Sequence, residues 1–521
     1  MPIHNPRQPL TKKPEWKSLL TLLESEFWWG GAVQDGVSMP FGPGTHQRNL
    51  AGCLSGNQGS PFLVSSKGRY IWNDKPFEFE FGDGELRVRG EHSDFLVKEG
   101  FANLREAFLN AVKSFFPPSG RLPHPLLFTK PQYNTWIELQ YGQEQGRIVE
   151  YAEAVLKNGF PAGVLMIDDT WQDDYGNWEF HAQRFPDPKG TMAHLHDLGF
   201  EVMLWLCPFV SPDSFNFRFL RDHGLLIRGA DGEVAIRKWW NGYSGMLDVT
   251  NPQAVQWLRE RLQTLTCEYG IDGFKFDAGD PDFYRDDDIS TQLVNANEQA
   301  EAWARIGVDY SLNEYRACWK GAGLPLVQRL SDKSHSWGEN GLASLVPNGL
   351  AQGLLGYAFT CPDMIGGGQQ TDFVDPEATI DQELFVRSAQ CSALFPMMQF
   401  SAAPWRVLDS GHTGLCREAV RLHERIAPEI EALACHAAAT GEPIIRPMAY
   451  EFPGLGLERV IDQFMLGRGI LVAPVVEKGA TSRLIRFPPG KWRGDDGSLV
   501  EGSANIAVNA PLSRLPWYRR E

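Results

Sequence analysis

Residues 252–280 read PQAVQWLRERLQTLTCEYGIDGFKFDAGD, a helical stretch followed by a short apolar strand that ends in an acid, Asp277. We predict a long helix from Pro252 to Tyr269 and a buried strand at 273–276. A helix that feeds directly into a buried strand is the repeating unit of parallel α/β folds.

The same unit recurs on both sides of this stretch. A helical pattern at 148–158 follows the first apolar run, and helical patterns separate most of the others. The apolar runs lie at 135–139, 163–167, 202–206, 310–314, 326–330, 358–361 and 397–400. Strand and helix alternating about eight times over about 300 residues is typical of a (β/α)8 TIM barrel, in the α/β class. An open doubly wound sheet is the alternative, but no glycine-rich phosphate-binding motif supports it.

The two ends of the chain have β character instead. Residues 77–81 alternate with period two, and Gly82-Asp83-Gly84 predicts a hairpin turn before the strand at 86–89. Prolines between 117 and 125 indicate a linker, and residues 469–476 form a buried-strand run near the C-terminus. We therefore predict an N-terminal β-sandwich (1–129), a catalytic barrel (130–440) and a small C-terminal β-sheet domain (441–521).

Composition excludes several classes of partner. The 521-residue chain carries a formal net charge of −16, which argues against nucleic acid and anionic membrane surfaces as partners. The chain contains no apolar run of about 18 residues, and its first residues lack the apolar region of a secretory signal. The eight cysteines are scattered singly, so we expect free thiols and a cytoplasmic location.

Acidic side chains follow five of the candidate strands, where catalytic residues of a barrel lie. They are Asp168, Asp169, Asp277, Asp280, Glu314, Asp332 and Asp363. One such acid is often only a helix cap, but several around one barrel mouth suit glycoside hydrolysis. In that reaction an ionised acid attacks the anomeric carbon, and a protonated acid donates its proton to the leaving oxygen. The same acids could bind a divalent cation. His194 and His196 do not share a helix face and no HExxH motif occurs, so we expect no metal and no organic cofactor.

At these residues the sequence resembles glycoside hydrolase family 31. Lys275-Phe276-Asp277 is similar to the family's nucleophile strand, and Asp332 is followed five residues later by Trp337, as is the family's general acid. Arg316 lies 16 positions before Asp332, the family's spacing for an active-site arginine. The resemblance covers nearly the whole chain and is strongest over residues 135–476, which include the typical family segments 462–467 and 471–475. It implies that Asp277 is the nucleophile and Asp332 the general acid and base of a retaining hydrolase.

The resemblance also implies a set of sugar-binding residues. Arg316 and Lys275 would bind the sugar and keep Asp277 ionised, and Trp240 would form a wall of the subsite. Asp168 would bind the O4 and O6 hydroxyls. The remaining predicted substrate-binding residues are Asp169, Glu314, Trp337 and Asp363, of which Asp363 is equally suited to orienting Arg316. Trp28 and Trp29 lie in the N-terminal region and suit either an aglycone site or the core equally well.

Departures from the family pattern bear on the substrate. Lys275 replaces a Trp found in many members, and Ser331, Cys207 and Ser401 replace the usual Gly, Asp and His. The Lys-Phe-Asp-Ala-Gly form looks like the branch that contains the myogenesis-regulating glycosidase and bacterial α-galactosidases. The segment Asp168-Asp169-Thr170-Trp171 resembles the Asp-Asp-x-Trp motif of α-galactosidases in related barrel families.

We therefore predict an exo-acting α-galactosidase whose substrate is a small oligosaccharide or glycoside. An α-glucosidase or a sulfoquinovosidase of the same family is the first alternative, and a non-catalytic sugar-binding protein on the same fold is an alternative of another class. The sequence leaves open whether the chain forms a homo-oligomer.

Overall fold

The computed structural model describes residues 15–42, 44–52, 54–90, 94–374 and 379–521. Its centre is an eight-stranded parallel sheet in which the strands follow one another in chain order and the last strand, β22, pairs with the first, β9. The strands are β9 (Gln132–Asn134), β10 (Val164–Ile167), β13 (Glu201–Leu206), β17 (Gly273–Phe276), β18 (Leu312–Tyr315), β20 (Gln328–Arg329), β21 (Thr360–Cys361) and β22 (Gln399–Phe400). The predicted (β/α)8 barrel is confirmed.

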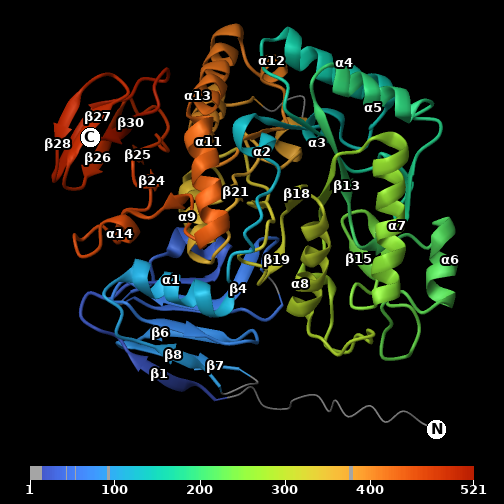
Figure 1. Cartoon of the computed structure of the whole chain (residues 1–521), viewed down its shortest axis with the longest axis horizontal. Coiled ribbons are helices and arrows are strands. Elements are labelled where there is room, and N and C mark those ends of the chain that lie inside the picture. Colours follow the sequence, from blue (N-terminus) through green and yellow to red (C-terminus); the bar gives the residue numbers. More distant parts are fainter. Residues whose placement is uncertain (1–14, 43, 53, 91–93, 375–378) are drawn as a thin grey trace.

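Helices surround the strands (Figure 1). They include α4 (Gln145–Lys157), α5 (Pro188–Asp197), α7 (Pro252–Tyr269), α8 (Ala296–Ile306), α9 (Leu345–Leu354), α11 (Gln382–Ala393) and α13 (Ser410–Thr440). Helix α7 has the predicted bounds. Asn251 caps its start by accepting from Gln253 N, and Gly270 ends it in the left-handed conformation.

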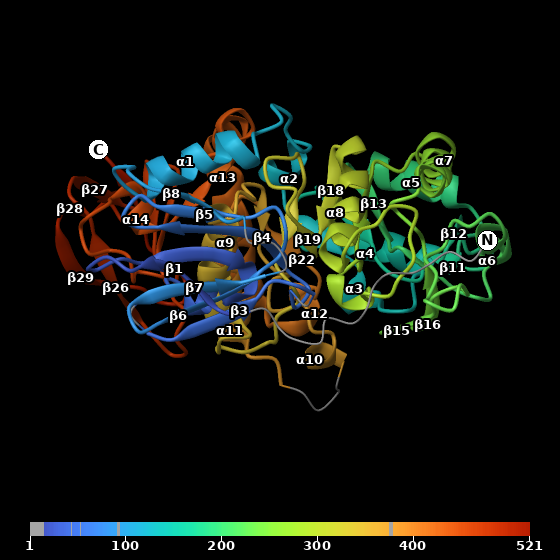
Figure 2. The same cartoon turned by 90° about the horizontal axis from the view of Figure 1, so that it is seen from below.

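The N-terminal region forms two sheets that lie beside one end of the barrel (Figure 2). One has the order β1 (Lys17–Thr21), β7 (Glu85–Arg89), β6 (Glu78–Gly82) and β3 (His46–Asn49). The other has the order β19 (Cys318–Trp319), β4 (Gln58–Ser65), β5 (Tyr70–Trp72) and β8 (Leu96–Lys98), with β2 (Trp28–Ala32) also on β4. The predicted hairpin is β6–β7, and the N-terminal β-sandwich is confirmed. Strand β19 belongs to the barrel segment of the chain, so the second sheet joins the two regions.

Two predicted elements differ from the structure. Helix α1 (Leu104–Phe115) lies in the region predicted as β, where it packs on β4, and Phe115 stacks on Trp72 at 4.5 Å between ring centroids. The predicted strand at 135–139 is instead the helical turn α3 (Trp136–Leu139), which follows β9. Asn134 Oδ1 accepts from Trp136 N at 2.8 Å and starts this turn. Short apolar runs fit either a strand or a helix, which explains the error.

The C-terminal region forms a six-stranded sheet with its own apolar core (Figure 1). The sheet contains β23 (Ile445–Arg446), β24 (Phe464–Leu466), β25 (Ile470–Val472), β30 (Trp517–Arg520), β27 (Lys491–Gly494) and β28 (Leu499–Glu501), and β26 (Ser482–Phe487) pairs with β29 (Ala504–Asn509) beside it. The small C-terminal β domain is thus also confirmed.

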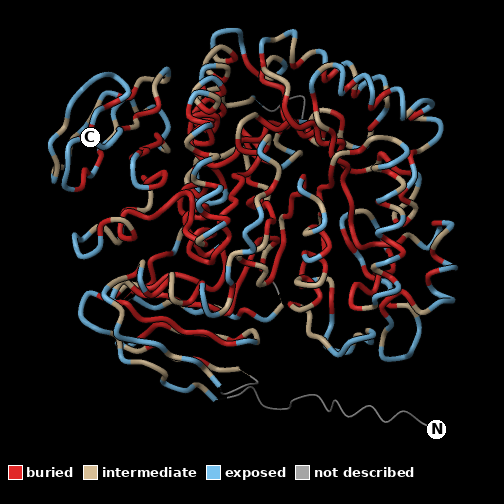
Figure 3. The backbone as a smooth tube through the Cα atoms, in the orientation of Figure 1, coloured by how far each residue is buried: buried red, intermediate tan, exposed pale blue. Residues whose placement is uncertain are grey.

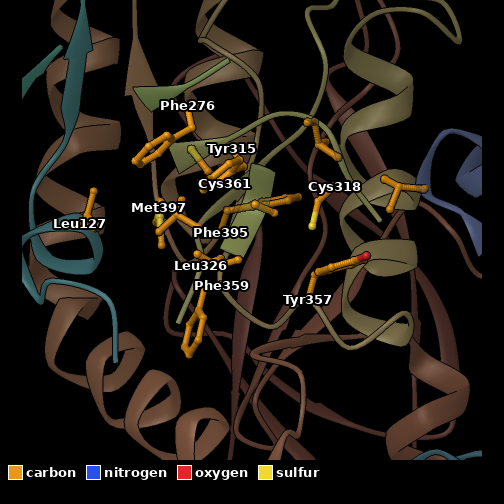
Figure 4. Packing of buried hydrophobic residues seen from close by; sticks show 14 of the residues in the cluster. Leu127, Phe276, Tyr315, Cys318, Leu326, Tyr357, Phe359, Cys361, Phe395 and Met397 are labelled. Carbon is orange, nitrogen blue, oxygen red and sulfur yellow. The ribbon is translucent and has the colours of Figure 1, made fainter. Parts of the chain in front are cut away.

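Burial is concentrated in the barrel strands and the inner helix faces (Figure 3). Phe276 and Tyr315 stack with 4.9 Å between ring centroids, within the apolar cluster drawn in Figure 4. Trp28 and Trp29 are 0% and 4% exposed, so both belong to the core rather than to an aglycone site. Within the described ranges, no helix has the length and apolarity needed to cross a membrane.

Candidate active site

A cavity of about 240 Å³ opens at the carboxyl ends of the barrel strands. The predicted residues that line it are Asp168, Asp169, Trp240, Lys275, Asp277, Arg316 and Asp332. Both predicted catalytic acids therefore share one cavity with most of the predicted sugar-binding residues.

Asp277 directly follows β17 and is held from three directions. Its Oδ1 accepts from Arg316 Nε at 3.1 Å and from Ala278 N at 2.8 Å, and its Oδ2 accepts from Trp205 Nε1 at 2.9 Å. Burial alone would raise the pKa of Asp277, but Arg316, Lys275 and the Trp205 hydrogen bond outweigh burial and hold the pKa well below its usual range. The carboxylate is therefore ionised and oriented, as a nucleophile must be.

Arg316 is itself fixed by two acids and one ring. Its Nη2 donates to Asp280 Oδ2 at 3.1 Å, and its guanidinium lies 5.5 Å from the ring centroid of Trp240. Trp240 is 46% exposed and lines the cavity, so it presents an apolar surface there.

Lys275 and Asp168 form a buried ion pair inside the cavity. The Nζ–Oδ2 distance is 2.7 Å, and the side chains are 5% and 4% exposed. Burial would lower the pKa of Lys275, but Asp168 and Asp277 raise it above its usual value. Since Asp168 Oδ1 also accepts from Asp169 N at 2.9 Å, the orientation of this carboxylate is fixed.

Asp169 is bound by neighbours on two loops. Its Oδ1 accepts from Tyr175 Oη at 3.0 Å and its Oδ2 from Asn241 Nδ2. The side chain of Asn241 in turn accepts from Tyr141 Oη at 3.0 Å. Burial and the adjacent Asp168 raise the pKa of Asp169 to about 7. The network ties the loop after β9 to the hairpin of β15 (Arg237–Trp239) and β16 (Gly242–Met246).

Asp332 lies three residues beyond β20 and is 32% exposed in its side chain. Arg329 Nη1 donates to Asp332 Oδ1 at 2.9 Å and to Asp363 Oδ1 at 2.7 Å, and Arg329 Nε donates to Glu314 Oε1 at 3.2 Å. One buried guanidinium therefore serves three carboxylates.

Three predicted substrate-binding residues are not among the residues that line the cavity: Glu314, Trp337 and Asp363. Glu314 is 1% exposed, and Arg329 and Gln399 occupy its two oxygens. Asp363 is also 1% exposed and orients Arg329 rather than Arg316, while its Oδ2 accepts from Lys333 N at 2.6 Å. Trp337 Nε1 donates to Asp381 Oδ2 at 3.0 Å. These three side chains bind other groups of the protein around the cavity, and their contact with a substrate stays a prediction.

Sequence reasoning missed several lining residues. Arg329 and Trp205 lie within strands and are not acids, so the pattern of acids at strand ends does not indicate them. The others are Trp136, Tyr141, Met364, Gly368, Gln369 and Gln370. Only its position at the end of β20, three residues before Asp332, could have indicated Arg329.

The cavity offers no set of metal ligands. Over the described residues, no group of three or more His, Cys, Asp and Glu side chains has a geometry that could hold a metal ion. The acids are instead paired with Lys275, Arg316 and Arg329.

Two family models match the chain. Residues 128–431 match the glycosyl hydrolases family 31 TIM-barrel domain, and residues 441–521 match the glycosyl hydrolase family 31 C-terminal domain. The chain is 32% identical over 418 residues to the myogenesis-regulating glycosidase of Mus musculus, covering 77% of this chain and 57% of the relative. It is 25% identical over 433 residues to the sulfoquinovosidase of Escherichia coli, covering 76% and 62%. The chain thus spans less than two thirds of either relative.

Among solved structures, the Flavobacterium johnsoniae GH31 dextranase complexed with glucose superposes with a TM-score of 0.83. The sequences are 21% identical, and the match covers 96% of this chain and 66% of the dextranase. At this identity the likeness shows the fold. With the family models matching the barrel and the C-terminal domain, the predicted resemblance is confirmed: the chain belongs to glycoside hydrolase family 31.

Proposed function

We propose that this protein is a retaining α-glycosidase in which Asp277 is the nucleophile and Asp332 the general acid and base. The observation that carries the proposal is the placement of both acids in one cavity, with Asp277 kept ionised by Arg316, Lys275 and Trp205. Retaining hydrolysis needs an ionised acid that attacks the anomeric carbon and a second acid that gives a proton to the leaving oxygen.

The reaction follows in two steps. A carboxylate oxygen of Asp277 attacks the anomeric carbon, the glycosidic C–O bond breaks, and the Asp332 carboxyl gives its proton to the departing oxygen. In the second step the Asp332 carboxylate takes a proton from water, the water oxygen attacks the anomeric carbon, and the ester bond to Asp277 breaks. Arg316 stays paired with Asp280 while Asp277 is esterified, and the Arg316–Asp277 ion pair forms again when Asp277 is released.

The size of the cavity supports exo-action. Its volume of about 240 Å³ lies below the roughly 300–1,000 Å³ of sites for drug-sized ligands. A single pyranose ring is a better match to this space than an internal stretch of a polysaccharide.

Among sugars, we propose an α-D-galactoside as the substrate. The paired Asp168 and Lys275 present an acceptor and a donor at fixed positions in the cavity, 2.7 Å apart. A sugar whose C4 hydroxyl points toward Asp168 gains one further hydrogen bond to this carboxylate, worth about 1.5–3 kcal/mol, which a sugar whose C4 hydroxyl points away does not make. The stereochemistry at C4 is therefore what this pair would select.

A sulfoquinovoside is the second candidate, because a curated relative is named a sulfoquinovosidase. A sulfonate needs a cation free to bind it. Each Lys and Arg that lines the cavity is already paired with a carboxylate: Lys275 with Asp168, Arg316 with Asp277, and Arg329 with Glu314 and Asp363. This charge balance favours a neutral sugar.

A panel of p-nitrophenyl α-glycosides tests both parts of the proposal. The expected result is turnover of the α-galactoside, with the α-glucoside and the α-sulfoquinovoside slower by about 10–100-fold. Turnover of the glucoside or sulfoquinovoside without the galactoside would reject the galactose assignment and leave the glycosidase in place.

The variant Asp277→Asn separates an enzyme from a non-catalytic sugar-binding protein. It should abolish turnover and retain sugar binding, measured by calorimetry. Asp173→Asn is the control, because Asp173 is an exposed acid outside the cavity. Unchanged turnover in Asp277→Asn, or its absence in the wild-type protein across the whole panel, would reject the proposed activity.

A further inference from the structure

A loop of the N-terminal domain reaches the barrel beside the cavity. Residues 54–57 precede β4 and turn through Ser55 and Gly56, whose φ angles are 53° and 65°. A Cβ on Gly56 would lie 2.3 Å from Arg316 Nη1, so only glycine allows this approach. The loop backbone therefore packs directly against the arginine that pairs with Asp277.

Both ends of the Asn57 amide bind the residue before Asp332, and its Nδ2 also donates to Ser55 O at 3.4 Å. Its Nδ2 donates to Ser331 Oγ at 2.9 Å, and its Oδ1 accepts from Ser331 N at 3.0 Å. Asn57 is fully buried. Two reciprocal hydrogen bonds to the main chain and the side chain of one residue fix both the position and the rotation of that residue.

Gln58 anchors the same loop to neighbouring segments of the barrel. Its Nε2 donates to the carbonyl oxygens of Arg316 and Arg329, the second at 2.9 Å. Its Oε1 accepts from Gln352 Nε2 at 2.6 Å, and β4 pairs in parallel with β19. Asn57 therefore projects from a rigid base.

Asp332 depends on this support because its own side chain is partly exposed. Its Oδ1 accepts from Arg329, whose guanidinium is shared with Glu314 and Asp363. Asp332 is thus held at two points, its carboxyl by Arg329 and the main chain directly before it by the contacts of Ser331 with Asn57. A misplacement of about 1 Å in a catalytic group can cost about 100-fold in rate.

We propose that Asn57 is a positioning residue for proton transfer by Asp332, so that the N-terminal domain is part of the catalytic apparatus. This inference rests on the proposed role of Asp332 as the general acid and base. It adds a residue outside the barrel to the reaction.

Leaving-group dependence tests the inference. A methyl glycoside needs a proton on its departing oxygen, whereas a 2,4-dinitrophenyl glycoside of the same sugar does not. Since kcat/KM reports the first step, Asn57→Ala should lower kcat/KM for the methyl glycoside by about 10–100-fold and change the dinitrophenyl value by less than about threefold. Loss of stability alone would lower both values equally.

Asp332→Ala and Asn73→Ala are the two variants with which the substrate selectivity of Asn57→Ala is compared. Asp332→Ala should show the same selectivity with a larger loss. Asn73→Ala removes another buried amide of the N-terminal domain, whose Oδ1 accepts from Lys75 N at 2.9 Å, and should affect both substrates equally. If Asn57→Ala does not fold, Ser331→Ala decides instead, because it removes one of the two hydrogen bonds and should show a smaller selective loss.

The outcomes separate the two claims. Selective loss in Asp332→Ala together with an equal loss for both substrates in Asn57→Ala and Ser331→Ala would overturn the positioning role and leave the proposed function intact. No selective loss in Asp332→Ala would overturn the acid and base assignment, and with it this inference.

Discussion

Lys275 Nζ lies 2.7 Å from Asp168 Oδ2, and neither side chain is more than 5% exposed. The two residues come from strand β17 and the end of strand β10, on either side of β13. The ion pair therefore spans β13 at the mouth of the barrel. Because both residues also line the cavity, a change to either one should alter both the stability of the fold and the binding of substrate.

Removing the lysine should leave a buried charge without a partner. Lys275→Met is expected to lower the free energy of unfolding by about 3–5 kcal/mol, measured by urea unfolding. The double variant Lys275→Met with Asp168→Asn should recover part of this loss. Lys491→Met is the control: its pair with Glu501 is exposed and should contribute less than about 1 kcal/mol. Equal losses in Lys275→Met and Lys491→Met would contradict the prediction.

Because of Asp169, the free energy of unfolding should fall as the pH rises from about 4 to about 7. Its pKa is raised to about 7 by burial and Asp168, so the folded chain binds a proton in this window that the unfolded chain has released. In Asp169→Asn the free energy of unfolding should fall by about 2–4 kcal/mol less over this pH range than in the wild type, measured from urea unfolding at several pH values. The exposed control Asp173→Asn should keep the wild-type slope, and an Asp169→Asn slope as steep as that of the wild type would refute the prediction.

Arg387 should hold the C-terminal domain against the barrel. This buried side chain of α11 donates to carbonyl oxygens of that domain, at 2.8 Å to Ala510 and 3.0 Å to Arg514. Arg387→Met should lower the thermal midpoint by an amount equivalent to at least about 2 kcal/mol and speed proteolysis within residues 441–521. Arg519→Met, which removes an exposed pair with Glu429, should cost less than about 1 kcal/mol. Similar proteolysis rates for the two variants would show that Arg387 is not the anchor.

The fold could be predicted because its signals are local and repeated. Helix α7 has strong periodicity and defined caps, and β17 follows it with an acid at its end. The errors fall where the signal is short or mixed, as at α3, where the apolar residues that follow β9 have a pattern that fits a strand as well as a helix.

The candidate site could be predicted only in part. Asp277 directly follows its strand and reaches the cavity, whereas β18 continues to Tyr315 and leaves Glu314 one residue inside the strand. At this position in the strand, Arg329 and Gln399 from two other strands donate hydrogen bonds to the two carboxylate oxygens of Glu314. Such contacts depend on how far each strand extends, which one sequence does not define to a single residue.

The most direct measurement of the central claim is the mass spectrum of a trapped intermediate. A 5-fluoro-α-galactosyl fluoride should react with the protein, because its slowed second step lets the glycosyl ester accumulate. We predict one added sugar on the peptide that contains Asp277, and no addition in Asp277→Asn. A sugar attached to any other residue, or turnover of the α-galactoside with inversion at the anomeric carbon, would contradict the account.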